Sequence, residues 1–173
     1  MPSPMQVPDP TSTTVAPVTG PASFVGIQAV RVLDTRGDVQ TVGVPTAAPL
    51  GPNTTIDVQV AGIDQVPAEA TSVAINVTID FDATQKSFIT VWPTGEPRPL
   101  ASTNNAEPGL IAANSALMKV GTDGKISVFN QQGAVNVIID VTGYFVDDEP
   151  TEPTTTTTTT TEATTTTTAA PDT

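Results

Sequence analysis

The chain of 173 residues contains no cysteine and no histidine, and aromatic residues make up only 4% of it. The absence of cysteine excludes disulfides, thiolate nucleophiles and cysteine-based metal sites. The absence of histidine removes the most common general base and the most common transition-metal ligand. Catalysis would then need a pair of carboxylates or a Ser–Lys arrangement. The candidate carboxylates Glu69, Glu96 and Glu107 lie in proline-flanked, turn-like segments. We therefore expect no enzymatic activity.

Basic residues are also scarce, because six lysines and arginines face eighteen acids and the formal charge is −12. Twelve of the acids and all six bases lie within residues 22–147, which leaves −6 on that segment. Such a surface repels phosphate backbones and anionic lipid, so the sequence argues against nucleic acid and membrane surfaces as partners. No apolar run approaches membrane-spanning length, so we expect no membrane insertion of this segment.

Both ends of the chain have the composition of linkers. Residues 1–21 hold six prolines, and residues 148–173 are mostly threonine with a few acids. Neither segment has apolar periodicity, so we predict a disordered Pro/Thr-rich linker and a solvated acidic stalk that spans roughly 70 Å. Residues 1–10 lack the features of a signal peptide. A Thr-rich stalk is typical of exported proteins, so we expect an extracellular or cell-surface location and a longer parent protein.

Short apolar segments between glycines, prolines, asparagines and aspartates fill residues 22–147, which we predict to be one domain. Residues 54–60 and 72–81 alternate apolar and polar side chains, the period of a half-buried strand. Helical periodicity is absent, and residues 67–71 predict a single turn at most. The expected strands are 24–33, 39–44, 54–60, 72–81, 87–92, 112–120, 125–130 and 134–146. We predict an all-β fold, an antiparallel two-sheet β-sandwich or jelly roll of about eight strands.

Two dipeptides predict short connections between these strands. Asp123-Gly124 is typical of a type I′ hairpin turn, which needs positive φ at both central positions. Gln132-Gly133 lies between the last two expected strands and predicts another short connection. Both would join strands that are neighbours in the sequence.

Several motifs follow one another along the domain. RVLDTR occupies residues 31–36, and VPA at 66–68 is followed by VAINVT at 73–78. WPTGEPRP occupies residues 92–99 and is followed by ASTNN. The last two motifs are GTDGKISVFN at 121–130 and DVTGYF at 140–145. Over residues 30–146 they resemble a repeat domain of secreted and surface proteins of actinobacteria, in which tyrosine is common at the position of Trp92. The resemblance implies an exported β-domain. It implies no catalytic role or ligand, because none is established for that module.

Four charged residues form a candidate polar cluster. Strand alternation places Arg31 on one face, and Asp34 and Arg36 on the other. Asp140 lies inside an apolar strand, where a carboxylate is costly unless it is paired. The four residues could grip a sugar or a peptide carboxylate, but we favour a structural ion-pair network that fixes strand register.

Trp92, Tyr144 and Arg98 are the candidate ligand-binding residues. The two rings could stack on a sugar, although so few aromatics favour core packing for Trp92. Aspartate oxygens could also bind Ca²⁺, with Asp80 and Asp82 on one face. No calcium-loop spacing occurs, and we favour a solvated acidic surface for these residues, together with Asp38, Asp57, Asp64 and Asp123.

These observations predict a non-catalytic extracellular module on a Thr-rich spacer. Its expected task is attachment to cell-wall or environmental polysaccharide, or to surface proteins. The alternative is a structural spacer domain in a surface array with no ligand of its own.

Overall fold

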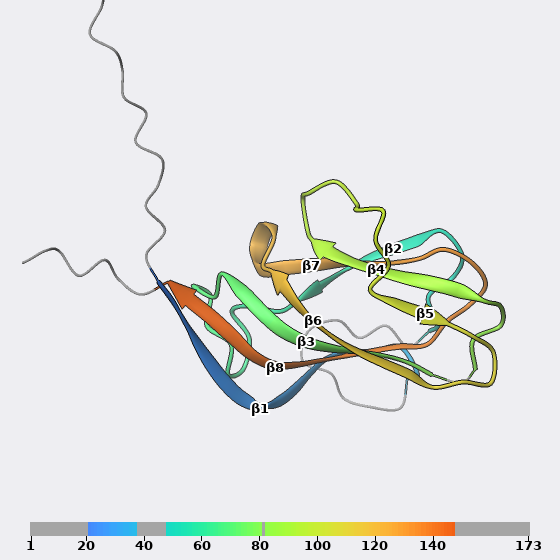
Figure 1. Ribbon diagram of the computed structural model, residues 1–173, viewed down its shortest axis with the longest axis horizontal. Coiled ribbons are helices and arrows are strands. Elements are labelled where there is room, and N and C mark those ends of the chain that lie inside the picture. Colours follow the sequence, from blue (N-terminus) through green and yellow to red (C-terminus); the bar gives the residue numbers. More distant parts are fainter. Residues whose placement is uncertain (1–20, 38–47, 81, 148–173) are drawn as a thin grey trace, which may run out of the picture.

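Eight strands make up nearly all regular structure in residues 21–37, 48–80 and 82–147, the part of the chain that the computed structural model describes (Figure 1). The strands are β1 (Ala22–Asp34), β2 (Thr54–Gln59), β3 (Ser72–Ile79), β4 (Ser87–Pro93), β5 (Asn104–Ala106), β6 (Ala112–Lys119), β7 (Lys125–Asn130) and β8 (Val137–Asp147), with one short 3-10 turn, η1 (Thr122–Gly124). The expected strand at 39–44, the predicted linkers and residue 81 lie outside the described residues. The other expected strands occur with bounds that differ by at most three residues.

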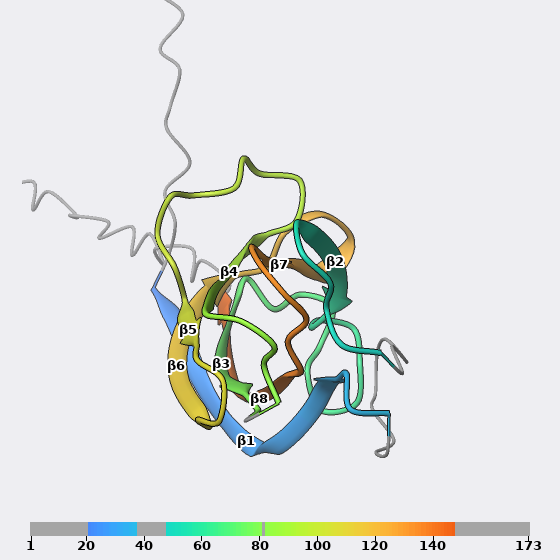
Figure 2. The same cartoon turned by 90° about the vertical axis from the view of Figure 1, so that its right-hand side faces the viewer.

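The strands form two four-stranded antiparallel sheets, in the orders β1-β8-β3-β6 and β2-β7-β4-β5. Figure 2 shows the two layers facing each other. The first strand pairs with the last, the second with the seventh, the third with the sixth and the fourth with the fifth. The chain is therefore a long hairpin rolled into two sheets, with β3–β8 and β4–β7 as the added pairs. This pattern is the jelly roll, and it confirms the predicted β-sandwich.

The core between the sheets follows the predicted alternation. On β3 every second residue from Val73 to Ile79 is buried, while the residues between them are half-buried. Val58 on β2 and Val128 on β7 supply the facing layer with no exposed surface. Burying apolar area contributes about 25 cal/mol per Å², so these aliphatic layers carry most of the stabilisation.

The hairpin predicted at Asp123-Gly124 is wrong in topology, although its turn has the expected backbone. The short connection predicted at Gln132-Gly133 occurs between the end of β7 at Asn130 and the start of β8 at Val137. Asp123 and Gly124 have φ of 57° and 75°. However, β6 lies in one sheet and β7 in the other, and β7 and β8 are divided in the same way. Each connection crosses between sheets because each strand needs its apolar face toward the shared core. Local turn chemistry does not encode that choice of sheet.

Strand β5 was not among the expected strands, since its three residues show no apolar alternation. Its buried Asn104 amide donates to the Val77 carbonyl at 3.0 Å and to the Ala112 carbonyl at 3.1 Å. A strand of one sheet is thus hydrogen-bonded to two strands of the other. Polar satisfaction, rather than burial of an apolar face, explains this strand.

Candidate functional site

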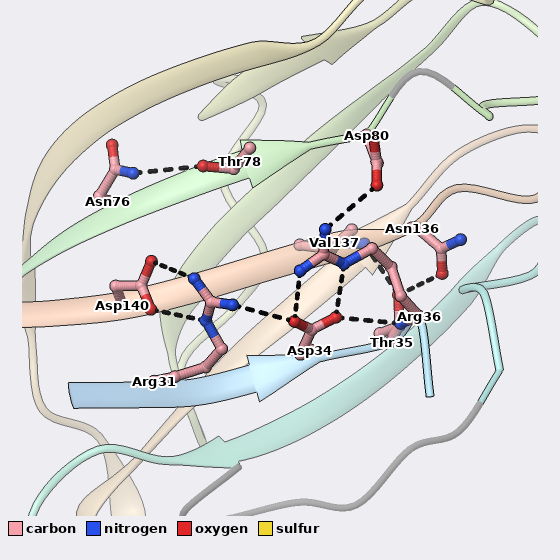
Figure 3. A network of polar contacts seen from close by, with 10 residues as sticks. All are labelled: Arg31, Asp34, Thr35, Arg36, Asn76, Thr78, Asp80, Asn136, Val137 and Asp140. Carbon is pink, nitrogen blue, oxygen red and sulfur yellow. Dashed lines mark hydrogen bonds and ion pairs between the residues drawn. The ribbon is translucent and has the colours of Figure 1, made fainter. Parts of the chain in front are cut away.

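The predicted charged cluster exists, and Asp34 is its centre (Figure 3). The Asp34 carboxylate is fully buried. It accepts hydrogen bonds from Arg31 Nη1 at 3.2 Å, from Arg36 Nε at 3.0 Å and Nη2 at 2.8 Å, and from the Arg36 backbone N–H at 3.1 Å. Arg31 also holds Asp140 through two bonds of 2.9 and 3.2 Å. Arg36 reaches Asp80 at 3.5 Å, which adds a fifth member to the network.

Strand alternation predicted that Arg31 and Asp34 face opposite sides, and this expectation is wrong. The pairing of β1 with β8 shifts between Arg31 and Leu33, where Asp140 and Ile139 stand opposite. A bulge of this kind inserts an extra residue and turns the following side chains. Arg31 therefore reaches Asp34 on the same strand and Asp140 on the next.

Three charges of the network, those of Arg31, Asp34 and Arg36, are stabilised in their ionised form. Hydrogen bonds from the Arg36 guanidinium hold the pKa of Asp34 below its usual range, against the opposing effect of desolvation. The hydrogen bond to Asp140 raises the pKa of Arg31, and the one to Asp34 raises the pKa of Arg36. A carboxylate that is held ionised by two arginines is a poor general acid or base. The arrangement therefore favours the structural interpretation of the cluster over a binding site.

A buried polar chain continues the network and was not recognised in the sequence. Thr35 Oγ1 donates to Asn136 at 2.8 Å and accepts from the backbone N–H of Val137 at 2.8 Å. The amide of Asn136 in turn donates to Asp82. Most of the RVLDTR motif thus connects the end of β1 to the start of β8 through hydrogen bonds and ion pairs.

Trp92 is buried, but not between the sheets. It is absent from the core between the sheets, whereas its neighbour Val91 belongs to that core, so strand alternation places Trp92 on the outer face of the second sheet. There it contacts Glu96 of the segment of residues 94–103, which connects β4 and β5. The indole is 8% exposed, and its Nε1 donates to the Glu96 carbonyl at 2.9 Å. The Arg98 guanidinium lies 3.6 Å above the ring of Phe129. The WPTGEPRP motif therefore builds a second, smaller core.

The three candidate ligand-binding residues do not come together. Tyr144 lies on β8 opposite Val73 and packs against the core between the sheets. Trp92 and Arg98 belong to the other sheet and its covering segment. No shared stacking platform forms from these residues.

The candidate calcium ligands are also dispersed. Within residues 21–37, 48–80 and 82–147, no group of three or more acidic side chains could hold a metal ion. Asp57 accepts from Ser127 at 2.6 Å and Asp82 from Asn136, so both carboxylates have protein partners. Asp38 lies outside the described residues.

The structure adds one surface that the motifs did not indicate. Two adjoining hollows of about 340 and 760 Å³ open where β1 begins and β8 ends, and we call them together the terminal groove. Ala22, Thr71, Ser72 and Lys119 line both hollows. Apolar side chains, chiefly Leu117, Met118 and Phe145, form one wall, whereas Glu96 and Asp147 line the other part.

An aromatic pair borders this groove on the outer face of the first sheet. The rings of Phe24 and Phe145 are 5.0 Å apart and tilted, and Phe24 is 53% exposed. Phe24 lies directly over Gly143, where a Cβ atom would collide with its ring. The sequence signal was the glycine inside the DVTGYF motif, because a glycine within a strand often marks close approach of another group.

No family model matches the chain, and no curated protein matches it either. Among the described residues no helix is long and apolar enough to span a bilayer. The functional argument therefore depends on the surfaces of the domain itself.

Proposed function

We propose that the chain is a non-catalytic, extracellular attachment module that binds polysaccharide in the terminal groove. The groove carries this proposal. It combines an apolar wall at Leu117 and Phe145 with the hydroxyls of Thr71 and Ser72 and the ammonium of Lys119. Sugars present apolar ring faces and a rim of hydroxyls, so a site with a few polar groups beside apolar side chains suits them.

The position of the two flanks supports a binding module over a structural spacer. Ala22 and Asp147 are paired across β1 and β8, so the chain enters and leaves the domain at one end (Figure 1). Antiparallel partners lie about 5 Å apart. A spacer domain is useful when its flanks leave from opposite ends, because only then does it lengthen the parent chain. This domain adds almost no length between its flanks and instead projects sideways from them.

The proposal is tested by incubating the full chain with purified cell-wall polysaccharide and with a glycan array. We expect saturable binding that Lys119→Ala weakens by about tenfold, the effect of losing one charge-assisted hydrogen bond. Lys86→Ala is the matched control, because Lys86 is also exposed and its ion pair with Glu107 lies on the surface. Exposed pairs contribute little, so this variant should bind like the parent chain.

Two results would contradict the proposal. Absence of saturable binding to every glycan would leave the spacer as the better interpretation. Equal loss of binding in both lysine variants would indicate nonspecific attraction to positive charge rather than a site in the groove.

A further inference from the structure

Arg98 carries an exposed guanidinium that the fold holds in one orientation. Its Cζ atom lies 3.6 Å from the centroid of the Phe129 ring. Phe129 is absent from the core between the sheets, whereas its neighbour Val128 belongs to that core, so strand alternation places this ring on the outer face of the second sheet. Pro97 and Pro99 restrict the backbone on either side of Arg98, because proline fixes its own φ and keeps the preceding residue extended. The cation is thus positioned by its backbone and by its stacking contact.

Hydrogen bonds also tie the segment of residues 94–103 to β4 on both sides of Arg98. They run from the Trp92 indole to the Glu96 carbonyl at 2.9 Å, from the Thr90 hydroxyl to the Ala101 carbonyl at 3.3 Å and from the Val91 N–H to the Thr103 hydroxyl at 2.9 Å. A side chain on such a segment loses less conformational freedom when it binds a ligand, so more of the interaction energy appears as affinity. The segment therefore presents Arg98 as a preorganised donor.

Arg98 differs from the other two arginines in its lack of a carboxylate partner among the described residues. Arg31 and Arg36 are paired with Asp34 and other aspartates of the charged network. Within residues 21–37, 48–80 and 82–147, Arg98 takes part in no ion pair or hydrogen bond, although twelve acids lie within residues 22–147. Its N–H donors are therefore available to a group from outside the domain.

We propose that Arg98 binds the carboxylate of a sugar acid within a polysaccharide. A guanidinium offers two parallel N–H donors that match the two carboxylate oxygens. Thr55, an exposed residue of β2, lies opposite Phe129 and adds a hydroxyl on the same face. The half-buried Phe88 ring lies 6.2 Å from the Phe129 ring and adds apolar surface. A sugar acid carries its carboxylate next to hydroxyls and an apolar ring face, so one ligand can use all three groups.

Charge favours a single carboxylate over other anionic groups. Residues 22–147 contain six more acids than bases, so the domain repels a ligand more strongly the more negative charge that ligand carries. A phosphate monoester carries nearly two charges at neutral pH, and an acidic protein surface brings several carboxylates together. A polysaccharide with scattered sugar acids brings one charge at a time. Neither Arg98 nor Thr55 lines the terminal groove, so this inference goes beyond the proposed function and does not depend on it.

Two disaccharides that differ in one group test the proposal. Cellobiouronic acid joins glucuronic acid to glucose, and cellobiose has a neutral hydroxymethyl group in place of the carboxylate. Each is titrated into the isotope-labelled full chain, and NMR follows the Arg98 Nε–H and the backbone amides of Thr55 and Phe129. We expect saturable shifts with the acid at a dissociation constant of about 1–10 mM. Cellobiose should bind at least about tenfold more weakly, since it lacks the charge-assisted hydrogen bonds.

Substitutions separate the paired donors of Arg98 from its charge. Arg98→Lys keeps the positive charge but loses the planar fork, and should weaken binding of the acid about fivefold. Arg98→Gln should weaken it at least about tenfold. Lys86→Gln is the matched control, because it removes an equal charge from another exposed residue and should bind like the native chain. Lys119→Ala, in the terminal groove, should also leave this binding unchanged.

Trp92 emission reports whether the segment of residues 94–103 keeps its position in the Arg98 variants, because the indole donates to that segment. If the emission shifts in both variants, Thr55→Val replaces them. It removes the exposed hydroxyl with little change in shape, and should weaken binding of the acid about threefold.

Three results refute the proposal: no saturable shift with cellobiouronic acid, equal affinity for both disaccharides, or equal weakening by Lys86→Gln. Unchanged binding in Arg98→Gln with native Trp92 emission places the site elsewhere and also refutes it. Tighter binding of triglutamate than of cellobiouronic acid would identify a peptide carboxylate as the ligand and would overturn the sugar acid.

Discussion

Replacing Asp34 with asparagine removes one negative charge from between two arginines without changing the size of the side chain. In the native protein that carboxylate is fully buried and accepts four hydrogen bonds, three of them from guanidinium groups. The variant keeps one oxygen as an acceptor and turns the other position into a donor that faces Arg31 or Arg36. Two positive charges then lie close together with less compensation.

The expected loss of stability follows from the burial of each partner. Removing one member of a buried ion pair typically costs about 3–5 kcal/mol. The side chains of Arg31 and Arg36 are each 34% exposed, so water compensates part of their charge and lowers that figure. We expect Asp34→Asn to reduce the free energy of unfolding by about 2–4 kcal/mol. For a domain of this size that corresponds to a fall in Tm of about 8–15 °C.

Thermal melts of the full chain as a function of pH measure this effect. The folded pKa of Asp34 is depressed, so its contribution is fully present above the unfolded value of about 3.9. It is lost as the pH falls through the lower folded pKa. The difference in Tm between the native chain and Asp34→Asn should therefore be constant between pH 5 and 7 and shrink below about pH 4.

Asp64→Asn is the control for this prediction. Asp64 is exposed in a turn with φ of 41°, a conformation that asparagine tolerates, so its variant should melt within about 2 °C of the native chain. A comparably small change for Asp34→Asn at pH 7 would refute the reasoning. So would a gap between native chain and variant that persists in acid.

Two further predictions concern the second core and its surroundings. Trp92 should emit at short wavelength and resist quenching by iodide, because its indole is covered by residues 94–103; free quenching would contradict the buried position. Gly121→Ala should reduce the free energy of unfolding by about 2 kcal/mol or more, since a Cβ atom there meets the backbone of Thr94. Gly109→Ala meets no neighbouring atom and carries only the cost of its positive φ, about 1 kcal/mol, so chemical denaturation should show a smaller loss of stability for it.

The fold could be predicted because its signals are local. Alternation on β3 and the composition of the intervening turns sufficed to indicate strands and a sandwich. What remained hidden depends on pairing between distant segments. Asp123 and Gly124 have the backbone of a hairpin turn, yet the strands beside them belong to different sheets. The choice between sheets is decided by which partners complete the core, and no short window of sequence contains that information.

Four of the five members of the charged network were predicted, but neither Asp80 nor the central place of Asp34 was. Asp140 drew attention because it lies within an apolar strand, and its side chain is 18% exposed. The fully buried Asp34 is more central, because the bulge between Arg31 and Leu33 turns it toward both arginines. The terminal groove had no sequence signal, since β3, β6 and the ends of β1 and β8 form it only after folding.

Pairing of the first strand with the last also determines how the domain responds to mechanical load. Tension applied at Ala22 and Asp147 acts on one end of the β1–β8 ladder, perpendicular to the two strands. In this unzipping geometry the hydrogen bonds break one pair after another. Under shear, by contrast, they would share the force. Separation begins at the Ala22–Asp147 pair and then breaks the Phe24–Phe145 contact. It must next pass the irregularity between Gly26 and Val30 before it reaches the Arg31–Asp140 ion pair. The ion-pair network therefore lies where it would resist further separation of β1 from β8 once that separation has begun at the flanks.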